Sequence, residues 1–244
     1  MEHAQVIWNF FGLEVNAKTM IMTWIVMAVL LILAFFVRSG ADMRNPGRIA
    51  NFFEWVFDFV SGLVKANIDE KRGANLMSLL VTLILFIFFS NLLGLFPNLT
   101  FGVFGHIVEG PTMASPTADL NTTLALAVLV NVLAIILGIN YQRGHYFKHY
   151  LEPFPPFIFI HLVELLAKPV TMAFRLYGNI FAGETLIALI LSMPILGLVF
   201  GGFIPQIVWL GFSIFVGAIQ SFVFTVLTIV YISQAIGAAE AESH

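Results

Sequence analysis

Five polar side chains recur along one of the most apolar parts of the sequence, residues 154–191. They are His161, Glu164, Lys168, Arg175 and Asn179. On a helix that turns through about 100° per residue, all five fall on one stripe roughly 60° wide. A charged side chain at the centre of a bilayer costs about 2.5–3.5 kcal/mol on insertion scales. The pattern therefore favours an ion pathway, or contact with a charged partner inside a membrane.

A structural alternative exists for part of this stripe. Glu164 and Lys168 lie four residues apart, the spacing at which opposite charges pair on a helix. Arg175 would then extend its side chain to the membrane interface. This alternative suits Arg175 poorly, because no acidic residue lies three or four positions away from it. Glu184 falls on the opposite face of the same helix, among small side chains.

Polar residues also recur along the next apolar segment, residues 203–239. Gln206, Ser213 and Gln220 follow one another at intervals of seven residues, so they share one helix face. Such a face either forms hydrogen bonds with a neighbouring helix or lines a water-filled passage. The spacing alone leaves both interpretations open.

Two further groups of polar residues favour structural roles. Ser90 and Asn91, like the other polar residues within 73–97, are typical of packing between membrane helices. The alternative for these residues is that they line a channel. In SPTADLN, residues 115–121, Asp119 precedes an apolar run, which favours a helix cap. The alternative for this stretch is a role in ion entry.

The composition is that of a membrane protein. Of the 244 residues, 59% are hydrophobic and 10% are charged, whereas soluble domains carry about 25% charged residues. The sequence has no cysteine, no phosphate-binding glycine loop, no metal-binding histidine spacing and no basic patch for nucleic acid. We therefore expect no cofactor, no metal, no nucleic-acid partner and no catalysis by the chain on its own.

The hydrophobic runs predict an all-α polytopic membrane protein, with one membrane domain over residues 1–244. A membrane-spanning helix needs about 20 mostly apolar residues. The five predicted membrane segments are 19–37, 73–97, 120–142, 154–191 and 203–239. Residues 48–65 have polar positions spaced by three and four, with Phe, Trp and Val opposite. That spacing predicts an amphipathic helix at the membrane surface.

The last two segments are too long for upright spans. As helices of 38 and 37 residues, each would be roughly 55 Å long, while the hydrocarbon core is about 30 Å thick. They are predicted to form a helical hairpin. Either both arms are strongly tilted, or the first arm kinks at Pro169.

The basic residues predict the orientation in the membrane. Eight of the eleven Lys and Arg residues lie within 38–72 and 141–153. Loops rich in Lys and Arg stay on the cytoplasmic side, so we expect the N-terminus outside and the C-terminus in the cytoplasm. The first residues lack the basic start and the cleavage site of a signal peptide, so we expect the first span to be retained.

Several stretches resemble one known family. FRLYGNIFAGE (174–184), ELLAKPVTMA (164–173) and GAIQSFVFTVLTIVYIS (217–233) closely resemble subunit a of F-type ATP synthases. PTADLN (116–121) and NFFEWVFDF (51–59) are similar to bacterial members. The resemblance covers nearly the whole chain.

The resemblance implies a non-catalytic membrane stator subunit of a rotary, ion-driven ATP synthase. Its partners would be the c-subunit ring, the b-subunit stalk, the rest of the complex and membrane lipid. Two offset aqueous half-channels would lead ions to and from carboxylates on the ring. The family's essential arginine matches Arg175, which would separate the half-channels and favour the ionised ring carboxylate. The implied location is a bacterial plasma membrane, and a thylakoid relative stays open.

The same resemblance assigns the other polar residues of the pathway. Glu184 matches the half-channel acid, while Asn179 and Gln220 match the polar lining and the neighbour of the arginine. Asp119 and Asn121 match a motif near the outer entrance.

One position departs from enteric-type relatives. Ser213 stands where they have a histidine that faces the acid, so we expect water beside Glu184 in place of a direct relay. His161 and Glu164 would supply further titratable groups on the same arm.

A rival interpretation is a self-contained ion channel or secondary transporter, which the composition and the number of spans would also suit. The unpaired Arg175, the overlong arms and the absence of internal repeats favour a chain completed by a membrane partner. Both H⁺ and Na⁺ stay open as the coupling ion, because the ring site decides between them.

Overall fold

The computed structural model describes residues 7–10, 13–39, 47–94, 102–103, 106–107, 115–142, 157–192 and 203–237. Within these residues the fold is almost entirely helical, as the sequence predicted. The α-helices of the described residues are α1 (Ala17–Ser39), α2 (Arg48–Lys65), α3 (Glu70–Ala74), α4 (Met77–Leu93), α5 (Leu120–Gln142), α7 (Phe157–Ser192) and α9 (Phe203–Gly237). A 3₁₀ turn, η1 (Pro116–Ala118), precedes α5.

Two short antiparallel hairpins complete the described structure. Strand β1 (Ile7–Phe10) pairs with β2 (Leu13–Asn16), and β3 (Gly102–Val103) pairs with β4 (His106–Ile107). The sequence analysis did not predict either hairpin. Each has only two strands, so neither forms a core of its own.

Three helical stretches among the described residues are long and apolar enough to cross a membrane. They are Ala17–Arg38, Leu120–Tyr141 and Ile207–Gly237. Helix α4 is apolar but shorter, at 17 residues. Of the five membrane helices predicted from the sequence, three meet this criterion among the described residues, whereas α4 and α7 do not.

The second predicted membrane segment, 73–97, begins differently from the prediction. It includes the end of the short helix α3, a turn at Asn75 and Leu76, and then α4. Gly73 lies so close to α2 that an added Cβ would overlap the Val64 side chain. The chain thus turns tightly beneath α2 before it enters α4.

Two hydrophobic clusters hold the helices together. In the first, Val56, Val60 and Val64 form a stripe at intervals of four on α2, which packs against α4 and α9. The second cluster joins α4, α5, α7 and α9. Its members include Leu83, Ile87, Ala127, Met172, Leu176 and Phe224.

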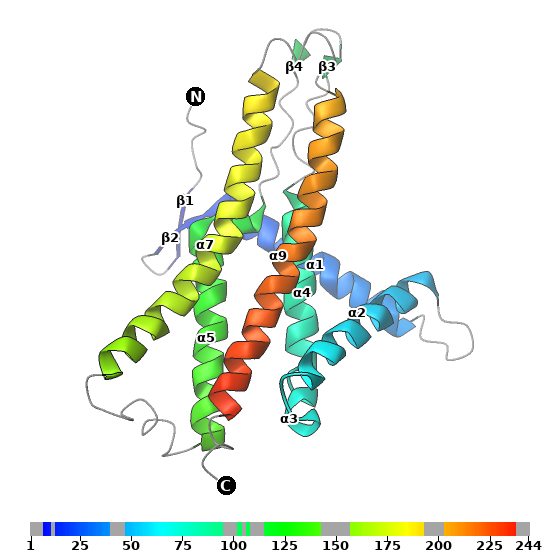
Figure 1. Cartoon of the computed structure of the whole chain (residues 1–244). Coiled ribbons are helices and arrows are strands. Elements are labelled where there is room, and N and C mark those ends of the chain that lie inside the picture. The colour runs from blue at the N-terminus through cyan, green and yellow to red at the C-terminus, as the bar shows by residue number, and fades with distance from the viewer. Residues whose placement is uncertain are drawn as a thin grey trace.

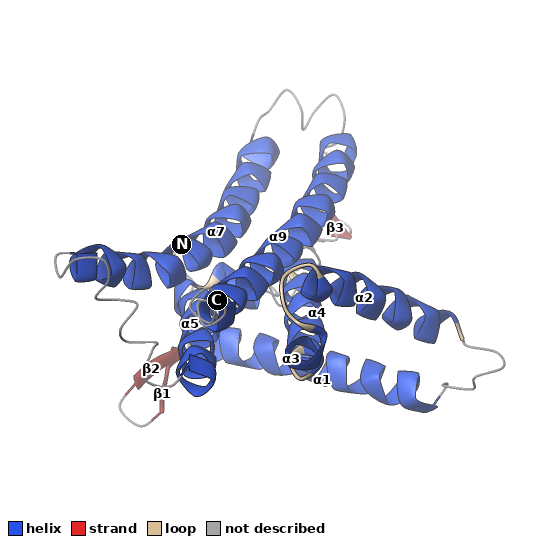
Figure 2. Ribbon diagram, turned by 60° about the horizontal axis from the view of Figure 1, so that its bottom comes forward, coloured by secondary structure: helices blue, strands red, loops and turns tan. Residues whose placement is uncertain are grey.

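Helices α7 and α9 are the longest elements, with 36 and 35 residues. They lie side by side and extend beyond α4 and α5 at one end of the molecule (Figure 1). Figure 2 shows that the first part of α7 runs in a different direction from its second part.

The bend in α7 has a local chemical cause. Pro169 lies inside the helix and removes one backbone N–H. Nearby, Thr171 Oγ1 lies 2.8 Å from the carbonyl oxygen of Ala167 and 3.0 Å from that of Lys168. Proline and threonine bonded in this way both bend helices. The long arm and the kink, which the sequence offered as alternatives, thus occur together.

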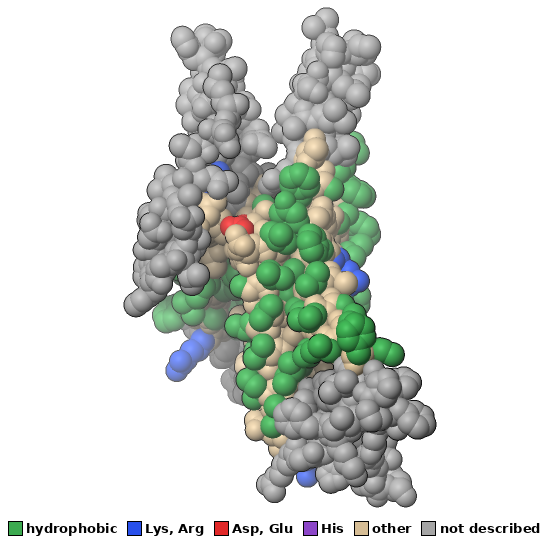
Figure 3. Space-filling model, turned by 90° about the vertical axis from the view of Figure 1, so that its left-hand side faces the viewer, with side chains coloured by type: hydrophobic (Ala, Val, Ile, Leu, Met, Phe, Trp, Pro, Cys, Tyr) green, Lys and Arg blue, Asp and Glu red, His purple; other side chains and the backbone are tan. Residues whose placement is uncertain are grey.

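Much of the outer surface is apolar. Figure 3 shows one face on which hydrophobic side chains gather over the middle of the described part, with few charged side chains among them. Large exposed side chains on α7 include Leu166 and Phe174, and those on α9 include Val208 and Phe215. Monomeric soluble proteins rarely expose an apolar area of this kind, so the surface fits lipid or a membrane partner.

Candidate functional site

Two contacts fix how α7 and α9 lie against each other. Near one end, Lys168 Nζ lies 5.1 Å from the ring centre of Tyr231. Towards the other end, a Cβ added at Gly183 would lie 3.8 Å from Cζ2 of Trp209. The helices are therefore antiparallel, and residue numbers that rise along α7 meet numbers that fall along α9.

This register brings Arg175 and Gln220 to the same level. Arg175 lies midway along α7 between the two contacts, and Gln220 lies midway between their partners on α9. These two polar residues, more than forty positions apart in the sequence, thus lie at a similar level along the helix pair, with Arg175 exposed and Gln220 buried.

Arg175 lies on the open side of α7. On the other side, Met172, Ala173 and Leu176 are almost completely buried in the second cluster. Arg175 itself is exposed, and within the part of the chain that the structure describes it forms no hydrogen bond or ion pair. The rigid attachment of one face therefore presents a charged guanidinium on the opposite, mostly apolar surface.

Gln220 has the reverse environment. Only 6% of it is exposed, and its amide nitrogen Nε2 has no acceptor among the described residues. A buried donor without an acceptor costs about 1–3 kcal/mol. A folded chain rarely retains such a donor without another use for it.

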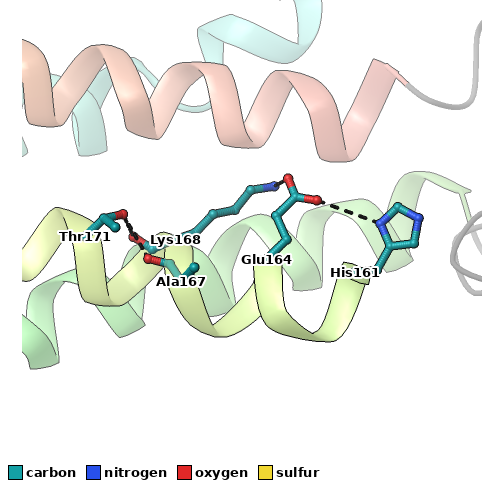
Figure 4. Close-up of polar contacts among 5 residues, drawn as sticks. All are labelled: His161, Glu164, Ala167, Lys168 and Thr171. Carbon is teal, nitrogen blue, oxygen red and sulfur yellow. Dashed lines mark hydrogen bonds and ion pairs between the residues drawn. The ribbon is translucent and has the colours of Figure 1, made fainter. Parts of the chain in front are cut away.

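The first part of α7 carries a compact charged cluster, drawn in Figure 4. Glu164 Oε1 lies 2.9 Å from Lys168 Nζ, and Glu164 Oε2 lies 3.8 Å from His161 Nδ1. The pairing of Glu164 with Lys168 that the spacing predicts is therefore confirmed.

Asp119 performs the structural role that its position favours. Its Oδ1 accepts a hydrogen bond from the backbone N–H of Asn121 at 2.9 Å. Its Oδ2 accepts one from the Thr19 hydroxyl at 3.2 Å, which ties the start of α5 to α1. The predicted cap at Asp119 is confirmed, while the Asn121 side chain lies on the exposed side.

A buried polar network lies close to the level of Gln220. Asn91 Nδ2 on α4 donates to the carbonyl oxygen of Gly217 on α9 at 3.2 Å. Asn91 Oδ1 accepts from the Thr117 hydroxyl at 2.8 Å. The Ser115 hydroxyl donates to the carbonyl oxygen of Ser90, also at 2.8 Å. These bonds join α4, η1 and α9 less than one turn before Gln220.

Glycine is required where this network brings the backbones together. A Cβ at Gly217 would lie only 3.2 Å from the Cβ of Asn91, and one at Gly94 would lie 2.6 Å from that of Ser115. The sequence placed Ser90 and Asn91 in helix packing, which these contacts confirm. The specific partners were missed, because nothing in the sequence around Asn91 indicates that Gly217, 126 positions away, lies beside it.

The remaining predicted residues lie on the same two helices. Asn179 is half-buried on α7, one turn after Arg175, and Ser213 is half-buried on α9. Glu184 belongs to α7 and Gln206 belongs to α9. The structure describes the backbone of these two residues but not their side chains. Among the described residues, no group of three or more His, Asp or Glu side chains could hold a metal ion.

Comparison with known proteins identifies the family. The family described as ATP synthase A chain matches residues 20–233. The chain belongs to the ATP synthase subunit a family. Arg175, Gln220 and the network around Asn91 all lie within the stretch that matches.

Bacterial members of the subunit a family align with nearly the whole chain. ATP synthase subunit a of Desulforamulus reducens is 46% identical, over 97% of this chain and 86% of that protein. The Bacillus subtilis protein of the same name is 39% identical, over 97% and 98% of the two chains. That of Alkalihalophilus pseudofirmus is 35% identical over 100% and 99%.

Proposed function

We propose that this chain is the membrane stator subunit of an F-type ATP synthase, and that α7 and α9 face the rotating ring of c subunits. One observation carries the proposal. Arg175 is an exposed, unpaired cation on an apolar face, among the described residues, and its helix is fixed by the buried face behind it. Such a charge is costly in lipid, and a passing carboxylate on a membrane partner would compensate it.

Arg175 would act on the ring carboxylate through its fixed charge. An opposite charge within about 4–6 Å lowers the pKa of a carboxyl group by about 1–3 units. A protonated ring carboxyl that arrives beside Arg175 would therefore release its ion. Arginine stays protonated throughout, so Arg175 cannot itself relay the proton, and direct passage from one half-channel to the other is blocked.

Polar groups on either side of Arg175 would form the two half-channels. Towards the hairpin end lie Asn179 and Glu184 on α7 and Ser213 on α9. Towards the other end lie Glu164, whose side chain is half exposed, and His161, which is more buried. Gln220, whose amide is buried at the level of Arg175, would donate to water or to the ring carboxylate beside it.

Asp119 and Asn121 have a more limited role in this proposal. Both carboxylate oxygens of Asp119 already accept hydrogen bonds, from Asn121 and Thr19. They would shape the outer entrance by holding α5 to α1, and the ion would not need to bind to Asp119.

The proposal also places the chain in the membrane. Helices α1, α4, α5, α7 and α9 would be the five membrane-embedded helices, and α2 would lie at the surface. With the basic residues in the cytoplasm, the N-terminus would be outside and the C-terminus inside. The bacterial relatives favour a bacterial plasma membrane.

The test uses the complete complex in liposomes, with Arg175→Ala compared with wild type. We expect the variant to assemble but to lose ATP synthesis and ATP-driven ion pumping, while passive ion leak persists or rises. Arg48→Ala is a matched control, because Arg48 is equally an exposed arginine but lies on α2. Normal synthesis by Arg175→Ala would contradict the proposal. Ion conduction by the purified chain alone would favour the rival, a self-contained channel.

A further inference from the structure

A cavity lies far from Arg175, where the turn between α2 and α3 meets the end of α9. Its volume is about 560 Å³, within the range of roughly 300–1,000 Å³ that ligand sites occupy. Its polar lining comes from Lys65, Asn67, Asp69, Arg72 and Ser233. Figure 1 shows α3 and the end of α9 at the end of the molecule opposite the hairpin of α7 and α9.

The walls of this cavity are held together across the sequence. The Ser233 hydroxyl on α9 donates to the backbone carbonyl of Asn67 at 2.6 Å. Behind the polar lining, Ile68 and Ile236 belong to the first hydrophobic cluster. The cavity is therefore a fixed feature of the packing between α2, α3 and α9.

The cavity presents charges of both signs. Lys65 and Arg72 are cationic, and Asp69 is anionic. Asp69 precedes α3, but its side chain makes no capping hydrogen bond. Helices α2 and α9 both end here, and the C-terminal end of a helix carries partial negative charge. A ligand with one negative and one positive group would match this arrangement.

An apolar surface leads away from the cavity between the same two helices. The rings of Phe59 on α2 and Phe222 on α9 lie 5.7 Å apart, and both are partly exposed. Beside the cavity, the Arg72 guanidinium lies 5.2 Å from the ring centre of Tyr141. Aromatic and basic side chains together are typical of the headgroup level of a membrane. The ligand is therefore expected to combine a charged head with apolar chains.

We propose that this cavity binds the phosphoethanolamine headgroup of a membrane phospholipid. Its phosphate lies between Lys65 and Arg72. Basic residues that line a pocket in this way are typical of sites that bind lipid headgroups. Its ammonium faces Asp69 and the last carbonyl groups of α9. Its acyl chains follow the apolar surface marked by Phe59 and Phe222.

The first experiment counts the phospholipids that stay bound to the purified complete complex after detergent exchange, by native mass spectrometry. The double variant Lys65→Gln/Arg72→Gln and the single variant Lys65→Gln are compared with Lys71→Gln, which removes one positive charge from a neighbouring residue outside the cavity and so matches the single variant. We expect roughly fivefold weaker retention for each cavity cation removed, and no loss with Lys71→Gln. Equal retention by the double variant and wild type would overturn the proposal.

Assembly of the complex is checked by the presence of its other subunits. If the double variant fails to assemble, Lys65→Gln alone decides the matter, since Lys65 is exposed and outside the core. Retention unchanged in Lys65→Gln would overturn the proposal.

The second experiment distinguishes the headgroups and a free anion. The delipidated complex is titrated with phosphatidylethanolamine, with phosphatidylglycerol and with inorganic phosphate. We expect preferential binding of phosphatidylethanolamine, and Asp69→Asn should reduce that preference without weakening phosphatidylglycerol. A preference unchanged by Asp69→Asn would overturn the ethanolamine assignment. Saturable binding of inorganic phosphate that excludes both lipids would overturn the lipid assignment.

Discussion

The two cationic side chains in the middle of α7, Lys168 and Arg175, lie about two helical turns apart and differ in their partners. Lys168 Nζ is 2.9 Å from Glu164 and 5.1 Å from the ring centre of Tyr231. Arg175 forms no hydrogen bond or ion pair within the described part of the chain. The charge of Lys168 is thus compensated by Glu164 on the same helix and by the ring of Tyr231 on α9. The charge of Arg175 has no such partner among the described residues.

Under the proposed function, this difference separates a structural charge from a functional charge on one helix. A carboxylate one turn away can compensate a cation at little cost, because helix geometry alone brings the pair together. A cation without such a neighbour needs a partner that arrives from elsewhere. The same residue class on the same helix face thus has two roles, and its local partners distinguish them.

The largest expected effect on ATP synthesis comes from replacing arginine by lysine at position 175, compared with the reverse replacement at position 168. Arg175→Lys keeps the charge but introduces a group that loses its proton when desolvated. We expect ATP synthesis in liposomes to fall roughly tenfold or more, since each unit of pKa shift corresponds to a tenfold change in equilibrium. Lys168→Arg, the reverse exchange, should leave synthesis nearly unchanged. Similar losses in both variants would remove the distinction between the two sites.

An intermediate effect is expected from loosening α9 at the level of Arg175. Asn91→Leu removes the hydrogen bonds that Asn91 makes with the Thr117 hydroxyl and the Gly217 carbonyl, while Thr117 keeps its bond with the Ser115 hydroxyl. Loss of such buried hydrogen bonds costs about 1–3 kcal/mol. We expect a lower thermal midpoint for the complex and reduced synthesis.

The matched control for Asn91→Leu is Asn67→Leu. Asn67 is exposed in the turn after α2, and its side-chain amide donates to the nearby Leu63 carbonyl of that helix, so it joins no distant elements. A thermal midpoint that falls equally in both variants would mean that the network does not position α9.

The smallest effect is expected within the charged cluster. Glu164→Gln removes the ion pair with Lys168, but 51% of the Glu164 side chain is exposed. Exposed pairs contribute only about 0–1 kcal/mol to the free energy of unfolding. That free energy should therefore change by no more than about 1 kcal/mol, and the rate of ATP synthesis should stay within about twofold of wild type. The measurements are chemical denaturation of the complex and ATP synthesis in liposomes. A loss as large as that of Arg175→Lys would make Glu164 an essential ion-carrying group and not only a polar group that lines the half-channel.

The sequence predicted features that depend on local helix geometry. The spacing of Glu164 and Lys168 was enough to predict their pairing, because residues four apart always lie close together on a helix. The same reasoning predicted that Arg175 has no partner on its own helix. The cap at Asp119 also follows from neighbouring residues alone.

Features that join distant segments were beyond the sequence. The network of Asn91, Thr117 and Gly217 brings together three elements, and no periodicity in any one of them encodes it. The turn at Asn75 that separates α3 from α4 was missed for a similar reason. It depends on the close approach of Gly73 to Val64 on another helix, while hydropathy records only an apolar run.

The exposed Arg175 also has a consequence for biogenesis. Until its partner arrives, a newly inserted chain carries a charge that costs about 2.5–3.5 kcal/mol in the bilayer. Under the proposed function, a ring carboxylate would cover this charge only after assembly, so an exposed guanidinium would distinguish unassembled copies. Membrane quality control that recognises exposed charge would degrade those copies first, and Arg175 would then also regulate the abundance of the subunit.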